Sequence, residues 1–198
     1  MKKVVKFGGS SLASAEQFKK VGNIIRKEES RRYVIPSAPG KRTPDDTKVT
    51  DMLYSCYGQA ILGEDAERDF EEQLEAIKER YNSIIRGLNL DLSLDEEFKT
   101  IRTNFSKKIG RDYAASRGEY LNGIIMAAYL GYEFIDAAEV IVFDENGYTS
   151  LTQFPEIRSQ LLLVNGVSKS YAMTGWRIGF LAAPEEIAAA VIKYQGHT

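Results

Sequence analysis

A lysine and two glycines stand close together near the N-terminus, in the run Lys6-Phe7-Gly8-Gly9-Ser10. Glycines at the junction of a strand and a helix let backbone N–H groups approach an anion, and the helix dipole favours negative charge there. The Lys6 ammonium would add a positive charge to the same phosphate. The lysine precedes the glycines, which is not the order of a Walker loop, and the run is not G-x-G-x-x-G. From the residues alone, phosphate binding and a plain tight turn both stay open.

Two further places carry residues that could take part in chemistry. Arg117 and Glu119 lie within a predicted helix that is rich in small residues. Neighbouring charges in the middle of a helix usually form a solvated face, so these residues by themselves favour a surface role. Lys169 and Arg177 lie in a stretch of glycine, serine, threonine and aromatic residues near the C-terminus. The structural alternative there is a buried strand followed by an aromatic loop.

Composition excludes several other kinds of site. One cysteine, Cys56, and one histidine, His197, rule out an internal disulfide and a Cys/His zinc cluster, so we expect no metal site. A total of 26 Lys and Arg against 28 Asp and Glu lacks the basic surplus of a non-specific nucleic-acid binder. The sequence shows no signal-peptide pattern and no apolar run near the ~20 residues of a membrane span. We therefore expect a cytoplasmic chain that associates with neither nucleic acid nor membrane.

Apolar periodicity predicts the elements that must position these residues. A strand at 3–7, the glycine turn, a helix at 13–28 and a strand at 32–37 follow the order of a parallel unit with a right-handed crossover. Further helices are predicted at 64–88, 95–109, 112–130 and 185–194, and short strands at 133–137, 139–143 and 161–164. The alternating charges on the outer face of the first of these helices indicate a solvated surface. The chain is expected to be of the α/β class.

Four motifs together resemble the N-terminal catalytic half of aspartokinases, in the amino acid kinase family. They are KFGGSSLAS at 6–14, VIPSAPGKRT at 34–43, SRGEYLNG at 116–123 and YEFIDAAEVIVF at 132–143, and the resemblance covers residues 1–147. It implies a three-layer α/β/α sandwich, here truncated. It also implies transfer of the γ-phosphoryl group of ATP, bound with Mg, to the side-chain carboxylate of aspartate in amino-acid biosynthesis.

The resemblance assigns roles to individual residues. Lys6 would neutralise the charge of the transferring phosphoryl group, and Ser37 would lie near the aspartyl substrate. Glu119 would bind the amino group of aspartate, whereas the role of Arg117 is left open. The backbone that would cradle phosphate oxygens belongs to Gly8, Gly9 and Ser10. Such a site is chemically reasonable because phosphoryl transfer depends mainly on positioning and charge stabilisation.

The sequence lacks one run that the family carries in its second half. No glycine-rich G-R-G-G-S-D type run, with its arginine and aspartate for the substrate, occurs anywhere in the 198 residues. The nucleotide-binding elements and regulatory ACT domains of the family have no counterpart either. We therefore expect weak turnover or none.

Residues 148–198 resemble another enzyme family. The run from Gly166 to Gly179 resembles the pyridoxal-phosphate lysine segment of class-I aminotransferases, aspartate aminotransferase in particular. The resemblance implies that Lys169 forms the internal Schiff base and that Arg177 holds the cofactor phosphate. Other cofactor and substrate residues of that family have no counterpart here. A Schiff-base lysine needs surroundings that depress its pKa, which an isolated segment does not reliably supply.

The family that the sequence resembles changes near Gly147, and three hypotheses follow. The first is an aspartokinase-type enzyme or its remnant, with aspartate as substrate. The second is a pyridoxal-phosphate protein. The third is a non-catalytic chimeric α/β domain in which the strand at 161–164 completes the sheet. If that segment does not cover the apolar sheet, the chain is expected to self-associate, so a homo-oligomer stays open.

Overall fold

The computed structural model describes residues 2–140, 155–156, 161, 163–166 and 179–195. The chain divides into two compact units, Met1–Val140 and Ile141–Thr198. Each unit is described by itself. The assignment of residues 1–147 and 148–198 to two different enzyme families stays a prediction.

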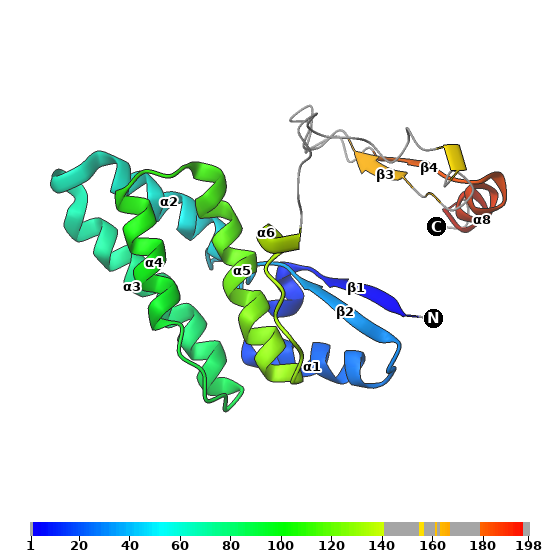
Figure 1. The fold of residues 1–198 in the computed structure, drawn as a ribbon, viewed down its shortest axis with the longest axis horizontal. Helices are drawn as coiled ribbons and strands as arrows, with labels where there is room; N and C mark the ends of the chain where they lie inside the picture. The colour runs from blue at the N-terminus through cyan, green and yellow to red at the C-terminus, as the bar shows by residue number, and fades with distance from the viewer. Residues whose placement is uncertain (1, 141–154, 157–160, 162, 167–178, 196–198) are drawn as a thin grey trace. The chain divides into compact units, whose positions relative to one another are not determined.

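The first unit begins with a strand, a glycine turn, a helix and a second strand (Figure 1). Strand β1 (Lys3–Phe7) leads through a 3₁₀ turn η1 (Gly9–Leu12) into helix α1 (Ala15–Arg26), and β2 (Arg31–Pro36) follows. The two strands pair in parallel, which confirms the predicted order. Apolar residues at steps of three and four, Phe18, Val21 and Ile25, bury one face of α1 against the core.

Four longer helices complete this unit (Figure 1). They are α2 (Val49–Leu62), α3 (Glu67–Gly87), α4 (Asp95–Ser106) and α5 (Arg111–Leu130), with a 3₁₀ turn η2 (Gly63–Ala66) between the first two. Helix α2 packs against α3, α4 and α5, and α5 also packs against β2 and α1. The predicted helices at 64–88, 95–109 and 112–130 are confirmed, whereas the sequence analysis had set no bounds for α2.

Helix α2 shows why its sequence gave a weak signal. Its buried residues Val49, Leu53, Cys56 and Tyr57 form a helical stripe. Exposed apolar residues such as Leu62 lie on the same helix and blur the contrast between its two faces.

The strands predicted at 133–137 and 139–143 are wrong within the described residues. Residues 132–136 have no regular structure, and α6 (Ala137–Val140) is a single helical turn. Asp136 favours this turn because its side chain accepts a hydrogen bond from the Ala138 N–H at 3.0 Å. No described strand pairs with this segment, so no ladder compensates for extending it. Residues 141–143 lie outside the described residues.

The second unit contains a two-stranded antiparallel sheet of β3 (Leu163–Gly166) and β4 (Gly179–Ala182), followed by helix α8 (Glu185–Gln195). Val164 lies opposite Leu181 in this ladder. The hypothesis that the segment at 161–164 completes the sheet of the first unit stays a prediction, since the pairing of β3 with β4 concerns the second unit alone. The predicted helix at 185–194 is confirmed.

The sheet of the first unit has two described strands, so its architecture is that of a helix-rich α/β unit. Val5, Phe7 and Val34 pack toward the core, while Val4 and Ile35 on the other face are 68% and 50% exposed. The three-layer sandwich and the self-association expected from an uncovered sheet stay predictions. Among the described helices, none is long and apolar enough to cross a membrane.

Candidate functional site

The carboxyl end of the β1–β2 sheet brings together two of the residues singled out from the sequence. Lys6, the last residue but one of β1, donates a hydrogen bond from Nζ to Oγ of Ser37 at 3.2 Å. Ser37 follows β2 directly, and its N–H donates to the carbonyl of Phe7 at 3.0 Å. Because the strands are parallel, both of their carboxyl ends open at the same edge, where ligands bind in open α/β sheets.

The glycine turn lies against the loop that follows β2. The Gly40 N–H donates to the Gly9 carbonyl at 2.8 Å. A Cβ atom at Gly9 would meet the Ala38 carbonyl oxygen at 2.7 Å, and one at Gly40 would meet the Gly9 carbonyl carbon at 2.6 Å. Both positions therefore require glycine, because two backbone segments touch there. The turn is part of a fixed two-loop arrangement and is more than a simple reversal of the chain.

Helix α5 brings the SRGE motif to the end of β2. A Cβ atom at Gly118 would lie 2.7 Å from the Ala38 Cβ, so the helix and the loop are in close contact. Four residues further on, the Asn122 amide donates to the Ser37 carbonyl at 2.6 Å. Glu119 lies between these two contacts in sequence and is exposed. The fold thus places Glu119 on the helix segment that borders the Lys6–Ser37 edge.

Tyr81 on α3 fixes the same part of α5 from the other side. Its hydroxyl donates to the Gly118 carbonyl at 2.8 Å, and the side chain is fully buried. Burial raises the pKa of Tyr81 well above its usual range, and the negative charge of Glu119 raises it further. The phenol therefore stays protonated and keeps its hydrogen bond.

Arg117 is occupied by neighbours on its own helix. Its guanidinium lies 4.5 Å from the ring centres of both Tyr113 and Tyr120 and donates to Ser116 Oγ at 3.0 Å. These cation–π contacts hold the side chain along the helix surface. The role of Arg117 at the site stays open.

Arg80 is a residue of this region that the sequence analysis missed. The alternating charges of the helix at 64–88 predict a solvated outer face, but the residue Arg80 on this helix is only 4% exposed. It donates to the carbonyls of Ala13 and Gly40 at 3.2 and 2.7 Å and to Oδ2 of Asp46 at 2.7 Å. A sequence signal existed, because Arg80 stands three residues after Ile77, on the apolar face of α3.

Asp46 joins this buried arginine to the loop after β2. Its carboxylate also accepts hydrogen bonds from the Arg42 backbone N–H and Nε, both at 2.8 Å. Hydrogen bonds from Arg42, and then from Arg80, hold the pKa of the Asp46 carboxyl far below its usual range. Asp46 is therefore ionised at neutral pH.

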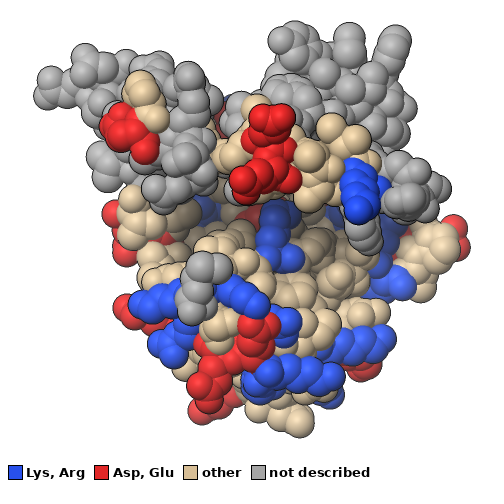
Figure 2. Space-filling model, turned by 90° about the vertical axis from the view of Figure 1, so that its right-hand side faces the viewer, with Lys and Arg blue, Asp and Glu red and all other residues tan. Residues whose placement is uncertain are grey.

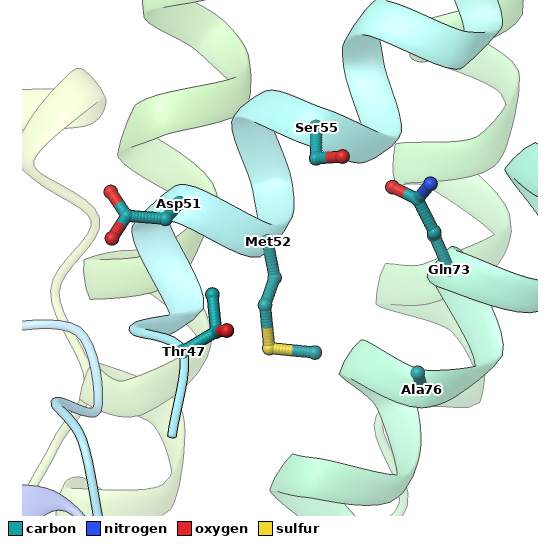
Figure 3. A pocket seen from close by; sticks show the side chains of 6 residues that line it. All are labelled: Thr47, Asp51, Met52, Ser55, Gln73 and Ala76. Carbon is teal, nitrogen blue, oxygen red and sulfur yellow. The ribbon is translucent and has the colours of Figure 1, made fainter. Parts of the chain in front are cut away.

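A separate hollow of about 210 Å³ lies between α2 and α3 (Figure 3). Its lining consists of Thr47, Asp51, Met52, Ser55, Gln73 and Ala76. Ser55 on α2 and Gln73 on α3 face one another across it, and the Met52 side chain lies between the helices (Figure 3). None of the residues predicted for catalysis or binding lines this hollow.

The remaining expectations concern metal, charge and the aminotransferase-like segment. Within the described part of the chain, no group of three or more His, Cys, Asp or Glu side chains could hold a metal ion. The face seen in Figure 2 carries Lys and Arg side chains interspersed with Asp and Glu, in keeping with a net charge of -2. Lys169 and Arg177 lie outside the described residues.

The chain belongs to the amino acid kinase family, whose family model matches residues 1–168. Within that family it is similar to aspartokinases. Aspartokinase 3 of Bacillus subtilis is 39% identical over 144 residues, which cover 70% of this chain and 31% of that protein. This chain therefore carries an aspartokinase-like amino acid kinase domain.

Solved structures agree with the family assignment. The aspartate kinase of Clostridium acetobutylicum is 50% identical with a TM-score of 0.67, over 74% of this chain and 33% of that one. Aspartokinase III of E. coli, solved with aspartate and ADP, shares the fold at 20% identity and a TM-score of 0.52, over 66% and 29% of the chains. The chain thus spans about a third of the length of the aspartokinases that it matches.

Aminotransferases also match parts of the chain. Aspartate aminotransferase of Rhizobium meliloti is 30% identical over 158 residues, which cover 77% of this chain and 36% of that protein. Aspartate aminotransferase of Thermotoga maritima is 38% identical over 85 residues, which cover 41% of this chain and 22% of that protein. These matches cover only part of each aminotransferase, so they show similarity to that family and no more. A chimeric origin of the chain stays a prediction.

Proposed function

We propose that the first unit binds aspartate and the phosphates of ATP at the carboxyl edge of β1 and β2, for phosphoryl transfer to the aspartate side chain. The observation that carries this proposal is the Lys6–Ser37 contact beside the touching Gly9 and Gly40 backbones. A cation next to a glycine-lined turn suits phosphate oxygens.

In the proposed reaction, an oxygen of the aspartate carboxylate attacks the γ-phosphorus. A new O–P bond forms, the bond to the bridging oxygen breaks, and ADP leaves with that electron pair. Lys6 would offset the negative charge that spreads over the transferring group. Glu119, exposed on α5 beside the Ala38 loop, would bind the aspartate ammonium by charge.

Magnesium would reach this site with the nucleotide. The described residues show no acidic cluster that could hold the ion by protein ligands, and Mg²⁺ in kinases is bound mainly by substrate phosphates with one or two carboxylates. Magnesium would neutralise phosphate charge when bound, and the roles of Lys6 and Glu119 stated above do not depend on it.

The proposal for these 198 residues is one of binding. They contain no G-R-G-G-S-D type run, so they do not themselves supply the substrate arginine and aspartate that the family resemblance implies. Positioning and charge stabilisation both supply large parts of phosphoryl-transfer catalysis, and these residues taken alone supply only part of each.

Isothermal titration with aspartate and with Mg-ATP tests the proposal. Lys6→Ala should abolish or strongly reduce heat with Mg-ATP, and Glu119→Ala should do the same with aspartate. Exposed residues on other surfaces of the unit provide matched controls, and Lys20→Ala and Glu75→Ala should bind as the wild type does. A wild-type protein that melts cooperatively and yields no heat with either ligand would refute the proposal.

A second candidate function is binding of pyridoxal phosphate through Lys169, favoured by the partial aminotransferase matches. Arg177 would hold the cofactor phosphate. Visible absorbance on addition of pyridoxal phosphate, lost in Lys169→Ala and retained in Lys193→Ala, would support it. Equal absorbance in both variants would indicate non-specific reaction with surface lysines.

A further inference from the structure

Arg80 contacts three separate backbone or side-chain groups from the middle of α3. Its Nη2 atom donates to the carbonyls of Ala13, where η1 passes into α1, and Gly40, in the loop after β2. Its Nη1 atom donates to Asp46 further along that loop. One guanidinium therefore connects both segments that meet at the glycine turn.

Burial of the Arg80 guanidinium is unfavourable for the stability of the fold. The Arg80 side chain is 3% exposed, and its Nε has no hydrogen-bond partner. A buried ion pair loses hydration on both ions, and well-packed apolar residues in its place are often as stable or more stable. The apolar face of α3 would accept such a residue, since Ile77, Tyr81 and Ile84 are buried around this position.

We propose that Arg80 is the positioning residue that holds the glycine turn and the loop after β2 in register at the phosphate site. The proposal rests on the function proposed above. The Gly40 carbonyl bonds to Arg80 while the Gly40 N–H bonds to the Gly9 carbonyl, so a restraint on Gly40 is transmitted directly to the turn.

An arginine suits this task better than a lysine. The planar guanidinium presents donors in fixed, divergent directions and can satisfy two carbonyls and a carboxylate together. A lysine ammonium is a single point and would keep the charge opposite Asp46 while losing at least one carbonyl. Arg42 completes the arrangement because it binds the same carboxylate from the exposed side of the loop.

Hydrogen–deuterium exchange of the full chain tests this role. Arg80→Met keeps a long side chain without hydrogen-bond donors. It should raise the amide exchange rates in residues 9–13 and 38–46 about tenfold, because loss of one hydrogen bond from a charged group changes the opening equilibrium by about that factor. Exchange in α4, which accepts none of the hydrogen bonds that the Arg80 guanidinium donates to Ala13, Gly40 and Asp46, should change less than about twofold. Arg80→Lys should give an intermediate effect confined to the same two segments.

Arg86→Met is the matched control, because Arg86 lies on the same helix and pairs with Glu79 at the surface. It should leave both segments unchanged. Exchange that rises by the same factor in α4 and in the two loops would overturn the positioning role and leave only a general contribution to stability. If Arg80→Met does not fold, Asp46→Asn replaces it and should loosen residues 38–46 alone; no loosening there would overturn the proposal.

Titration of the same variants with Mg-ATP links the positioning to binding. Arg80→Met should weaken Mg-ATP binding about tenfold or more while Arg86→Met does not. Equal affinity in wild type and Arg80→Met would overturn the positioning role. Absence of binding in the wild type would instead refute the proposed function, and the exchange pattern would still decide whether Arg80 holds the two segments.

Discussion

Asp46 balances two guanidinium groups with a single carboxylate. Arg80 reaches it from the core and Arg42 from the exposed side, and its side chain is 13% exposed. The carboxylate is the only acidic partner that the structure gives to Arg80 among the described residues. Removal of its charge would leave a buried cation without compensation.

Asp46→Asn is expected to lower the free energy of unfolding by about 3–5 kcal/mol, the range for breaking a buried ion pair by removing one partner. Urea unfolding measured at neutral pH checks this value. Asp45→Asn, the neighbouring exposed carboxylate, serves as the control and should change stability little. An equal effect of both substitutions would contradict the special role of Asp46.

The same group predicts a dependence on pH. The folded-state pKa of Asp46 is depressed by Arg42 and Arg80, whereas an unfolded aspartate titrates near a pKa of about 3.9. Its contribution is therefore fully present above about pH 5 and is lost as the pH falls below the unfolded pKa toward the folded one. The difference in unfolding free energy between wild type and Asp46→Asn should shrink over that acidic range. A difference that is constant down to pH 2 would contradict the charge argument.

At the scale of elements, close approach of α5 to the loop after β2 decides where Glu119 lies. Gly118 allows this approach, because a Cβ there would meet Ala38 at 2.7 Å and Leu53 at 3.4 Å. The adjacent hydrogen bonds from Tyr81 and Asn122 then fix the rotation and height of the helix. A small residue in a helix thus has a positional function here that its propensity alone would not suggest.

Gly118→Ala is expected to displace α5 and to cost about 1–3 kcal/mol through overpacking. Gly58→Ala on α2 is the matched control, since a Cβ there meets no atom within 4 Å. That control should be stabilising by about 0.5–1 kcal/mol, because alanine favours a helix over glycine. Thermal unfolding of both variants gives the comparison, and stabilisation by both substitutions would show that α5 does not approach the loop so closely.

At the scale of the whole molecule, the large core lies within the first unit. The buried cluster runs in sequence from Leu12 to Met126 and draws on α1 to α5. The described residues of the second unit contribute none of its members. The first unit therefore has the packing that a domain needs to fold independently.

A chain of residues 1–140 alone is expected to unfold cooperatively, with a midpoint within about 5 °C of the corresponding transition in the full chain. Circular dichroism at the helical band measures both. Sedimentation of the same sample reports whether exposed Val4 and Ile35 lead to self-association. A shortened chain with no cooperative transition would show that residues beyond Val140 are needed for the fold.

The sequence by itself determined the elements with a clear period and the family of the first unit. Apolar steps of three and four predicted α1, α3 and α4, a run rich in small residues was assigned to α5, and the glycine turn between two apolar strands predicted the parallel pair. These signals are local, because each depends on residues within one or two turns of each other. The family resemblance came from four short motifs in the right order and is confirmed.

Only the tertiary structure decided which side chains meet. Lys6 and Ser37 are 31 positions apart and Arg80 and Gly40 are 40 apart, so no local pattern could pair them. The prediction of a strand at 133–137 was wrong for the same reason. A strand needs a partner to pair with, and the sequence of a single segment does not show whether a partner is present. Arg80 looked like a surface charge because burial of a charge depends on partners supplied by distant loops.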